Sequence, residues 1–483
     1  MRSLLSMTYA AQIALMSAAM AQTAPAASPY AFEKGYPTAQ AAKQAYDDAD
    51  FQRAVTAYRF WYPTVSMEGI FNGNRALGLE DNAAMAIMAA GPRQVGFTLN
   101  SDTPYGAAAL DLSRGPMVIE LPPGAYIGLV DDHHQGWVLD MGLPGPDEGK
   151  GGRHLILPPG YKGEVPAGYF AGRSLSNKVL AAVRALPVNA DVPGAMDALR
   201  AVRIYPLGAA NPTPVKMVDT TQMPADSTSL RWEDNIQFWQ VLHRVINEEP
   251  IVEKFLPMYG LLEAIGIEKG KPFAPDARMT AILERAAQAG REQMLVSAFA
   301  SDRPDRFAWP DRKWEWAGLV PGSAQFETPT GIDLEARDRW FAQAIVTSPA
   351  MFRRSAGAGS LYWLAARDAT EAYLDGGKSY RLTIPQPVPY RLFWSVTLYD
   401  AQTRSEVQTD QDKAALRSMF ELKDASKNEP TVLYFGPTAP ARNEGRWIKT
   451  VPGRGWFTYL RIYGPEHAAF DGSWKPGDME EVK

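Results

Sequence analysis

The stretch F-T-L-N-S-D-T-P-Y-G-A-A-A-L-D-L-S-R-G-P-M-V-I-E-L-P-P-G-A-Y-I-G-L-V-D-D-H-H, residues 97–134, guides the interpretation of the whole chain. It begins with a polar loop from Asn100 to Tyr105 and continues in short apolar runs broken by glycine and proline. It ends in a second polar group, Asp131 to His134. Short extended runs between turn residues are typical of β-strands. The stretch therefore predicts a β-rich region whose two polar clusters are candidates for one wall of a site.

The same pattern continues along the chain on both sides of this stretch. Extended runs are expected at 94–98, 107–112, 117–121, 126–131, 137–141 and 154–157. Such regular turn spacing predicts an antiparallel sandwich or jelly roll. A second β region is expected from Leu361. Within it, Arg391 to Asp400 alternates an apolar set with a mixed set, which is typical of a sandwich strand.

Three other parts of the chain have helical patterns. A helix is expected to open at Pro37-Thr38 and to end or kink at Pro63, because proline lacks the amide donor. A helical block is expected between Ser229 and Ala300, and Asp333 is expected to cap one more helix that runs to about Phe352. Shorter helices are expected at 174–186 and 194–201.

The N-terminus has the pattern of a secretory signal peptide. Arg2 precedes an uncharged apolar run from Leu4 to Met20, and Ala19-Met20-Ala21 is a small-x-small cleavage site. A membrane anchor would need about 20 strongly apolar residues, and this run is diluted by polar ones. We therefore expect cleavage near Ala21 and a periplasmic or secreted protein without a stable membrane span.

Composition narrows the classes of function. The chain of 483 residues has no cysteine, which fits an oxidising compartment and excludes thiol catalysis and disulfides. Its net charge of −5 is small, with both signs interspersed, so nucleic acid is not an expected partner. The length exceeds what one core supports. We expect a signal peptide at 1–21, a leader and helical segment at 22–90, a first β-rich domain at 91–228, a helical insert and linker at 229–352, and a C-terminal β-sandwich domain at 353–483.

The order of several motifs resembles a family of envelope proteins that carry two domains of unknown function, 1254 and 1214. The first resemblance rests on N-S-D-T-P-Y at 100–105, D-L-S-x-G-P at 111–116 and Asp131. The second rests on A-A-R-D-A-T at 365–370, Y-x-L at 380–382, F-W-S-V-T-L-Y-D at 393–400 and R-I-Y-G-P at 461–465. The resemblance implies a mainly β fold of two jelly-roll-like antiparallel β-sandwich lobes with helical additions. It implies no agreed activity.

The catalytic candidates are an Asp/Tyr/His set, namely Asp102, Tyr105, Asp131, His133 and His134. Asp102 is a candidate general base or ligand, and Tyr105 a proton donor. A divalent metal would need a third ligand beside an Asp–His pair, and Asp102 or His154 are the candidates. The structural alternative is that one of His133 and His134 caps a strand end while the other is solvated, and that the polar loop is a tight turn fixed by Pro104.

The ligand-binding candidates combine the polar loop with aromatic and basic residues of the second β region: Asn100, Thr103, Trp394, Tyr399 and Arg461. Aromatic faces can stack on sugar rings, although core packing is the alternative for most tryptophans. Motifs of serine hydrolases, zinc proteases and phosphate loops are absent from the sequence.

Three hypotheses follow from the sequence. The first is an exported protein that binds a small molecule or a saccharide-like ligand in a pocket between or within the lobes. The second is a hydrolase or lyase that uses the Asp/Tyr/His set, with or without a divalent metal. The third is a structural envelope component that forms homo-oligomers through exposed aromatic residues. Convergence of the candidate side chains on one cavity would favour the enzyme.

Overall fold

The computed structural model describes residues 29–208, 213–357 and 359–482. The signal-peptide pattern at 1–21 lies outside these residues. The chain divides after Ala49 into a short N-terminal unit and a large unit. The short unit holds the hairpin of β1 (Phe32–Glu33) and β2 (Tyr36–Pro37) and the start of helix α1 (Ala39–Ala76). The lobes, the other helices and the site belong to the large unit, which begins at Asp50.

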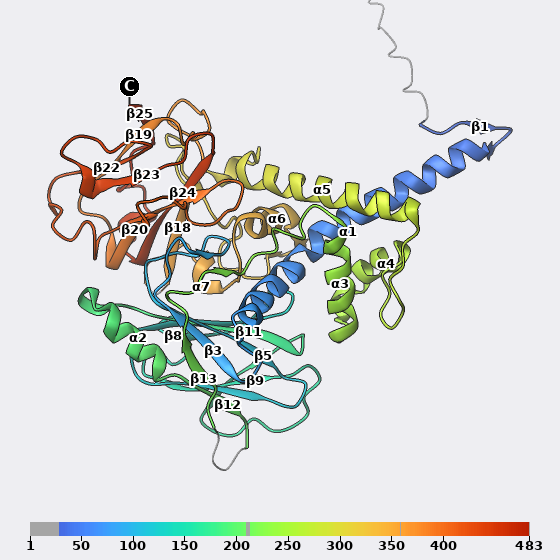
Figure 1. The fold of residues 1–483 in the computed structure, drawn as a ribbon, viewed down its shortest axis with the longest axis horizontal. Helices are drawn as coiled ribbons and strands as arrows, with labels where there is room; N and C mark the ends of the chain where they lie inside the picture. The colour runs from blue at the N-terminus through green and yellow to red at the C-terminus, as the bar shows by residue number, and fades with distance from the viewer. Residues whose placement is uncertain (1–28, 209–212, 358, 483) are drawn as a thin grey trace, which may run out of the picture. The chain divides into compact units, whose positions relative to one another are not determined.

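The first lobe, residues 84–208 and 213–226, packs two β-sheets face to face (Figure 1). Its large sheet runs in the order β13 (Lys216–Asp219), β3 (Ala84–Met88), β5 (Tyr105–Asp111), β11 (Lys178–Ala185), β7 (Tyr126–Asp132) and β8 (Trp137–Gly142). Its small sheet runs in the order β10 (Tyr169–Arg173), β9 (Gly152–Leu157), β6 (Met117–Leu121) and β12 (Arg203–Pro206). Helix α2 (Val192–Arg200) adds Met196 and Leu199 to the core, and β4 (Gln94–Val95) pairs with β14 (Ala225–Asp226).

The strand β11 corrects the helix expected at 174–186. Its side chains alternate: Val179, Ala181 and Val183 enter the core between the sheets, whereas Leu180 and Ala182 face the opposite side. Alanine and leucine favour helices when considered alone. Here β5 and β7 pair with both edges of β11, so tertiary pairing overrides the local preference.

The second lobe, residues 359–482 with β15 (Glu315–Trp316) at one edge, is also a two-sheet sandwich. Its large sheet runs in the order β15, β18 (Ser360–Ala365), β24 (Trp456–Pro465), β20 (Tyr390–Asp400) and β21 (Ala415–Arg417). Its small sheet runs in the order β23 (Trp447–Lys449), β22 (Thr431–Gly436), β19 (Ser379–Ile384) and β25 (Glu480–Val482). The alternation expected for 391–400 is confirmed from Trp394 onward, because Trp394, Val396 and Leu398 lie in the core between the sheets, whereas Leu392, expected on the same face, is exposed beside a register shift in β20.

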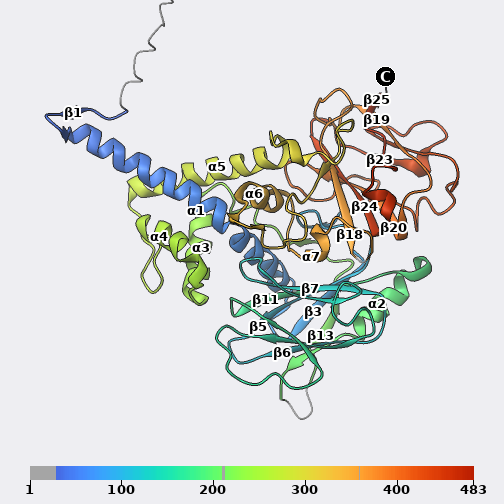
Figure 2. The same ribbon diagram turned by 180° about the vertical axis from the view of Figure 1, so that it is seen from behind.

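A helical layer adjoins the outer face of the second lobe's large sheet (Figure 2). The helices α6 (Leu334–Gln343), α7 (Pro349–Phe352) and one end of α5 (Ala277–Phe299) lie beside the sheet, and α1 from Asp50 onward, α3 (Ile236–Glu248) and α4 (Leu256–Ala264) extend the layer away from it. Apolar side chains of these helices share one core with Leu364, Tyr399, Phe457 and Tyr459 of the sheet. The remaining short elements are the hairpin β16 (Glu327–Thr328) and β17 (Gly331–Ile332) and 3-10 helices at Val188–Ala190, Glu253–Phe255, Pro304–Arg306, Glu444–Arg446 and His467–Ala469.

Helix α1 continues through Pro63, so the expectation that Pro63 ends the helix is wrong. A proline inside a helix leaves the carbonyl four residues earlier without its amide donor, and that carbonyl belongs to Arg59. The guanidinium group of Arg337 replaces the donor: Nη1 bonds to the Arg59 carbonyl at 3.4 Å and Nη2 to the Phe60 carbonyl at 2.8 Å. A side chain from α6 therefore allows the helix to pass its proline.

The fold is less β-rich and less regular than expected. Helices hold 27% of the residues and strands 28%, so the fold is mixed rather than mainly β. The lobes are not purely antiparallel, because β9 with β10, β3 with β13, and β22 with β23 pair in parallel. The jelly-roll connectivity is not confirmed. The helical block at 229–300 is confirmed, and Asp333 caps α6 as expected, but α6 ends at Gln343 rather than near Phe352.

Candidate functional site

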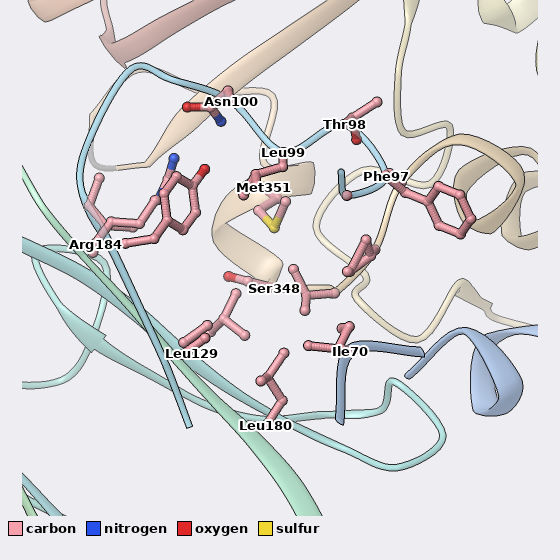
Figure 3. Close-up of a pocket in the computed structure, with 18 of the residues that line it drawn as sticks. Ile70, Phe97, Thr98, Leu99, Asn100, Leu129, Leu180, Arg184, Ser348 and Met351 are labelled. Carbon is pink, nitrogen blue, oxygen red and sulfur yellow. The ribbon is translucent and has the colours of Figure 1, made fainter. Parts of the chain in front are cut away.

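A cavity of about 190 Å³ lies between the two lobes (Figure 3). One wall is the face of the first lobe's large sheet that points away from that lobe's core. The opposite wall combines the loop 96–100 with the outer face of β18 and β24, and α1 and the segment 344–351 complete the enclosure. The cavity therefore requires both lobes and the helical layer to be in place.

Most of the cavity surface is apolar. Ile70 of α1, Leu129 of β7 and Leu180 of β11 lie together on one side, and Leu99 and Met351 lie across from them (Figure 3). The two-residue period of a strand explains the sheet side, since alternate residues face the cavity while those between them fill the lobe core. The wall is thus a direct product of strand pairing.

One part of the wall is polar and positively charged. Arg184 at the end of β11 and Arg461 on β24 both line the cavity, together with Asn100, Tyr105 and Tyr362. Arg184 and Asn100 are near each other in Figure 3, away from Ile70 and Leu180. Guanidinium groups stay protonated in proteins. The cavity therefore joins an apolar body to a cationic end.

Asp102 lies directly behind this cationic end and is 1% exposed. Its Oδ2 accepts hydrogen bonds from Ser395 Oγ at 2.8 Å and from the Tyr463 hydroxyl at 2.9 Å. The hydroxyl of Tyr463 in turn accepts from Arg184 Nη1 at 3.3 Å. Asp102 thus holds the polar wall in position through Tyr463 without reaching the cavity itself.

A second carboxyl group near Asp102 is unusually easy to protonate. Glu406 is buried, and its Oε1 accepts a 2.8 Å hydrogen bond from the amide of Ser101. Burial raises the pKa of Glu406 to about 7, although that hydrogen bond opposes the rise, and the charge of Asp102 adds to it.

Another acid, Asp140, lies on the cavity wall itself. It accepts hydrogen bonds from Ser348 Oγ at 3.0 Å and from Trp137 Nε1 at 3.2 Å, and burial raises its pKa to about 6.

Three of the residues singled out by the sequence line the cavity: Asn100, Tyr105 and Arg461. The others lie elsewhere for structural reasons. Thr103 is 2% exposed beside Asp102, and the hydroxyl of Tyr399 donates to the Thr98 carbonyl at 3.3 Å. Trp394 packs in the core of the second lobe, on the opposite face of β20 from the mixed residues. Core packing is thus the observed role of Trp394.

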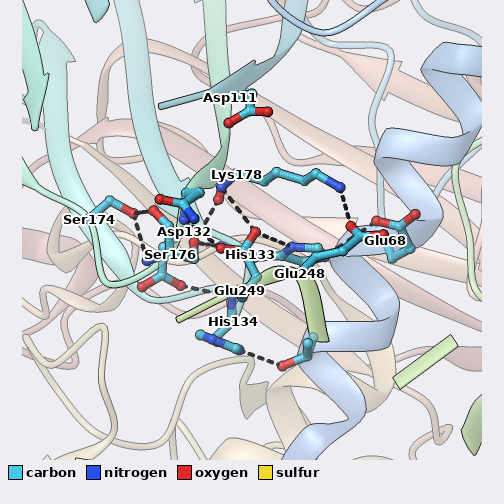
Figure 4. A network of polar contacts seen from close by, with 12 residues as sticks. Glu68, Asp111, Asp132, His133, His134, Ser174, Ser176, Lys178, Glu248 and Glu249 are labelled. Atoms are coloured by element: carbon cyan, nitrogen blue, oxygen red, sulfur yellow. Dashed lines mark hydrogen bonds and ion pairs between the residues drawn. The ribbon is translucent and has the colours of Figure 1, made fainter. Parts of the chain in front are cut away.

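His133 belongs to a separate buried ion network (Figure 4). Its Nδ1 lies 3.0 Å from Oε1 of Glu249, and its Nε2 lies 3.4 Å from Oε2 of Glu68 on α1. Burial alone would lower the pKa of His133, but hydrogen bonds and charges from both glutamates raise it above the ordinary value. The same histidine, with the charges of Arg75 and Arg244, lowers the pKa of Glu68 to about 2 against the effect of burial. The network joins α1 and the end of α3 to the turn after β7.

The two remaining catalytic candidates are also occupied by structural contacts. Asp131 Oδ2 accepts the amide of Thr347 at 2.6 Å, and burial raises the pKa of Asp131 well above its usual range. His134 Nδ1 lies 2.9 Å from Thr64 Oγ1, and burial together with the charge of His133 lowers the pKa of His134 to about 3. Of the five catalytic candidates, Tyr105 lines the cavity, whereas Asp102, Asp131, His133 and His134 do not.

The metal hypothesis gains no ligand set from the geometry. Within residues 29–208, 213–357 and 359–482, no group of three His, Cys, Asp or Glu side chains is arranged to hold an ion. Nε2 of His154, one suggested third ligand, lies 3.2 Å from Asp147 Oδ1 instead.

A search of residues 29–208, 213–357 and 359–482 for membrane-spanning helices finds none with the necessary length and apolar composition.

The sequence reasoning missed Arg184, which lines the cavity, and Tyr463, which lies between Asp102 and Arg184 behind the wall. Arg184 was hidden by the helix expected at 174–186, and strand alternation of V-L-A-A-V-R would have placed it on the face opposite Val183. Tyr463 belongs to the R-I-Y-G-P motif, in which it shares a strand face with Arg461. That alternation was the available signal for both residues.

Two family models match the chain. Residues 84–206 match a family described as protein of unknown function DUF1254, and residues 359–467 match one described as protein of unknown function DUF1214. This confirms the resemblance and its order along the chain. Both matched regions contribute to the cavity wall, the first through Arg184 and the second through Arg461.

Solved structures also resemble the chain. The VPA0106 protein from Vibrio parahaemolyticus has a TM-score of 0.55 at 18% identity, over 90% of this chain and 100% of that protein. An uncharacterized protein from Burkholderia cenocepacia has a TM-score of 0.39 at 12% identity, over 91% of this chain and 96% of the other. At 18% identity the likeness to the Vibrio protein concerns the fold alone. No curated protein matches the chain.

Proposed function

We propose that this protein, whose chain carries both the DUF1254 and the DUF1214 regions, is an exported protein of the cell envelope that binds a small molecule with an apolar body. The observation that carries the proposal is the cavity between the lobes. A concave, mainly apolar space with a few polar groups at one end is the usual form of a small-molecule site.

The composition of the wall favours an apolar ligand over a saccharide. A sugar would bring several hydroxyl groups against Ile70, Leu129 and Leu180, which offer no hydrogen bonds. Burying a hydroxyl group without a partner costs on the order of 1–3 kcal/mol. An apolar molecule gains free energy from the same contacts. The proposed ligand is therefore a small apolar molecule and not a saccharide.

The cavity does not favour the hydrolase or lyase hypothesis. That hypothesis needs acid, base and hydroxyl groups around one reacting atom. Tyr105 faces the cavity, but His133 is enclosed between two glutamates and His134 contacts Thr64. Ligand binding therefore accounts for more of the geometry than catalysis does.

A neutral probe tests the proposal. Benzyl alcohol and 1-hexanol should raise the melting temperature of the wild-type protein, because a ligand that binds only the folded state stabilises it by about 2.7 kcal/mol at 100 times its Kd. Ala182→Phe should remove the effect by filling the cavity. Ala107, its partner on β5, offers Ala107→Leu as a second variant.

The matched control is Ala171→Phe, on the exposed surface of β10. It adds the same ring at a distance from the cavity and should leave probe binding unchanged. Equal stabilisation of the wild type and of both filled variants by the probes would overturn the proposed site.

A further inference from the structure

We infer that the cavity selects small monoanions, with a carboxylate as the preferred group, through a paired guanidinium site formed by Arg184 and Arg461. The inference rests on the proposed function and names the chemical class of its ligand. It joins two residues that come from different lobes and from different matched regions of the chain.

Arg461 is a buried cation with unused donors. Its side chain is 1% exposed, and Nη2 donates to the Thr98 carbonyl at 3.2 Å. Nε and Nη1 have no hydrogen-bond partner among the described residues. The guanidinium group lies 4.8 Å from the ring centre of Tyr459 and 5.4 Å from that of Tyr399. Aromatic rings stabilise a cation but do not satisfy its N–H groups, so an anion in the cavity would supply the missing acceptor.

Arg184 of the first lobe adds a second positive charge to the cavity wall. Its guanidinium lies 5.6 Å from the ring centre of Tyr105 and 5.5 Å from that of Tyr463, and it donates to the Tyr463 hydroxyl. Both arginines thus donate to neutral acceptors of the protein: Arg184 to the phenol of Tyr463 and Arg461 to the backbone carbonyl of Thr98. Burial raises the pKa of Tyr105, a residue of the cavity wall, and the positive charges of both arginines oppose that rise.

The charges of this group of residues do not cancel. Asp102 favours the charged form of Arg461 and so raises the pKa of that arginine. The Oδ2 atom of Asp102 already accepts hydrogen bonds from Ser395 and Tyr463. Arg184 and Arg461 face the single carboxyl group of Asp102, which leaves one positive charge among the three.

Glu406, the other acid near Asp102, is bonded to the Ser101 amide and faces the charge of Arg417. Asp140, the acid on the wall, is bonded to Ser348 and Trp137, and the cation that acts on it is Arg353 rather than Arg184 or Arg461. One negative charge on the ligand would therefore balance the site.

Geometry favours a carboxylate as the carrier of that charge. A guanidinium fork matches the two oxygens of a planar carboxylate, and such charge-assisted bonds are roughly twice as strong as neutral ones. Tyr105 and Tyr362 lie on the same wall. The Tyr105 hydroxyl can donate to the anion, and that of Tyr362, which is bonded to Ser360 Oγ, can do so when Ser360 is the donor of that bond.

The size of the cavity limits the rest of the ligand. A cavity of about 150 Å³ holds benzene, and this one measures about 190 Å³. The apolar body is therefore about one aromatic ring or a short alkyl chain. Benzoate and hexanoate are suitable probes, with benzyl alcohol and 1-hexanol as neutral partners of matching size.

The first experiment is a charge series on the wild-type protein, measured by calorimetric titration. We expect affinity to fall in the order benzoate, benzyl alcohol, benzylamine, with at least about a tenfold step from the anion to the neutral probe. Hexanoate should exceed 1-hexanol in the same way. Equal affinities in both pairs, or a preference for benzylamine, would overturn the inference while leaving the proposed function standing.

The second experiment uses variants of the arginine pair. Arg184→Gln should weaken benzoate about tenfold or more and change benzyl alcohol by less than about twofold. Arg184→Lys keeps the charge without the fork and should fall between the wild type and Arg184→Gln. Arg114→Gln, at an exposed position after β5, removes a positive charge away from the cavity and should change neither affinity.

The variants also separate the two levels of the proposal. Arg461→Gln, with folding checked by circular dichroism, repeats the test from the other lobe. A parallel loss of benzoate and benzyl alcohol in the arginine variants would contradict anion selection. If no probe of either charge binds the wild type, both the inference and the proposed function fail.

Discussion

The hydroxyl group of Tyr463 donates a hydrogen bond of 2.9 Å to Oδ2 of Asp102. Tyr463 lies on β24 of the second lobe, and Asp102 lies in the turn before β5 of the first, so this bond joins the lobes behind the cavity. Ser395 adds a second bond from β20 to the same oxygen. The polar loop that the sequence singled out is thus a point of attachment between lobes as well as a neighbour of the ligand site.

Tyr463→Phe should destabilise the protein by about 1–3 kcal/mol. The variant keeps the ring that stacks on Phe393 with centroids 4.0 Å apart, but it removes a donor from a buried carboxylate. Urea denaturation measures the change. Tyr46→Phe, at a side chain that is 70% exposed, is the control and should have little effect. Equal stabilities of the two variants would show that the bond contributes nothing.

Glu249→Gln should lower the free energy of unfolding far more than the same change at its neighbour Glu248. Glu249 is 2% exposed and accepts from His133 and from the amides of Asn177 and Lys178, so its loss leaves His133 with a poorer partner. Breaking a buried ion pair costs about 3–5 kcal/mol. Glu248→Gln removes a carboxylate that pairs with Lys178 at the surface and should cost less than about 1 kcal/mol. Thermal unfolding of both variants decides the comparison.

Glu406→Gln should stabilise the protein at pH 8 and flatten its pH dependence. The folded-state pKa of about 7 lies above the ordinary 4.5, so the folded state binds more protons between these values. Stability from this group is therefore greatest below about pH 4.5 and falls as pH rises through 7. The gain at pH 8 should be on the order of 2 kcal/mol.

Urea denaturation of the wild type and of Glu406→Gln between pH 4.5 and 8 tests this prediction. Asp132, Asp140 and Asp338 have pKa values raised to about 6 by burial and act with the same sign, so a smaller slope remains in the variant. An unchanged slope would mean that Glu406 does not titrate in this range.

Arg337→Met should destabilise the protein by about 1–3 kcal/mol, because the Arg59 carbonyl then lacks both its helical donor and its substitute. Pro63→Ala restores an amide donor at this point of α1. The cost of Arg337→Met should therefore be smaller in the Pro63→Ala background. A double-mutant cycle by chemical denaturation measures this coupling, and additive effects would contradict the explanation for the uninterrupted helix.

Export can be tested on the full-length chain expressed in a Gram-negative host. Cleavage after Ala21 should give a mature protein that begins at Gln22 and appears in the periplasmic or secreted fraction. N-terminal sequencing of the fractionated protein checks both points. Replacing Ala19 and Ala21 with large charged residues should block processing, whereas an intact N-terminus in the wild type would overturn the proposal.

The elements that the sequence could predict are those whose signal is local. The alternation at Trp394, Val396 and Leu398 placed one face of β20 in a core, and Asp333 marked the start of α6. Lys178–Ala185 and Pro63 were misinterpreted because their structure depends on partners distant in the chain. The two neighbours of β11 and the guanidinium of Arg337 override the preferences of alanine and proline.

By itself, the sequence determined the order of the two matched regions, the helical block between them and the polar loop at Asn100. Only the tertiary structure decided which polar residues form a site. Asp102 and Tyr463 are 361 positions apart, and Arg184 reaches Tyr463 across 279. Contacts at such separations depend on how complete sheets pack, and this packing is a collective property of the buried faces. It brought Arg184 and Arg461 to one cavity and enclosed His133 between two glutamates.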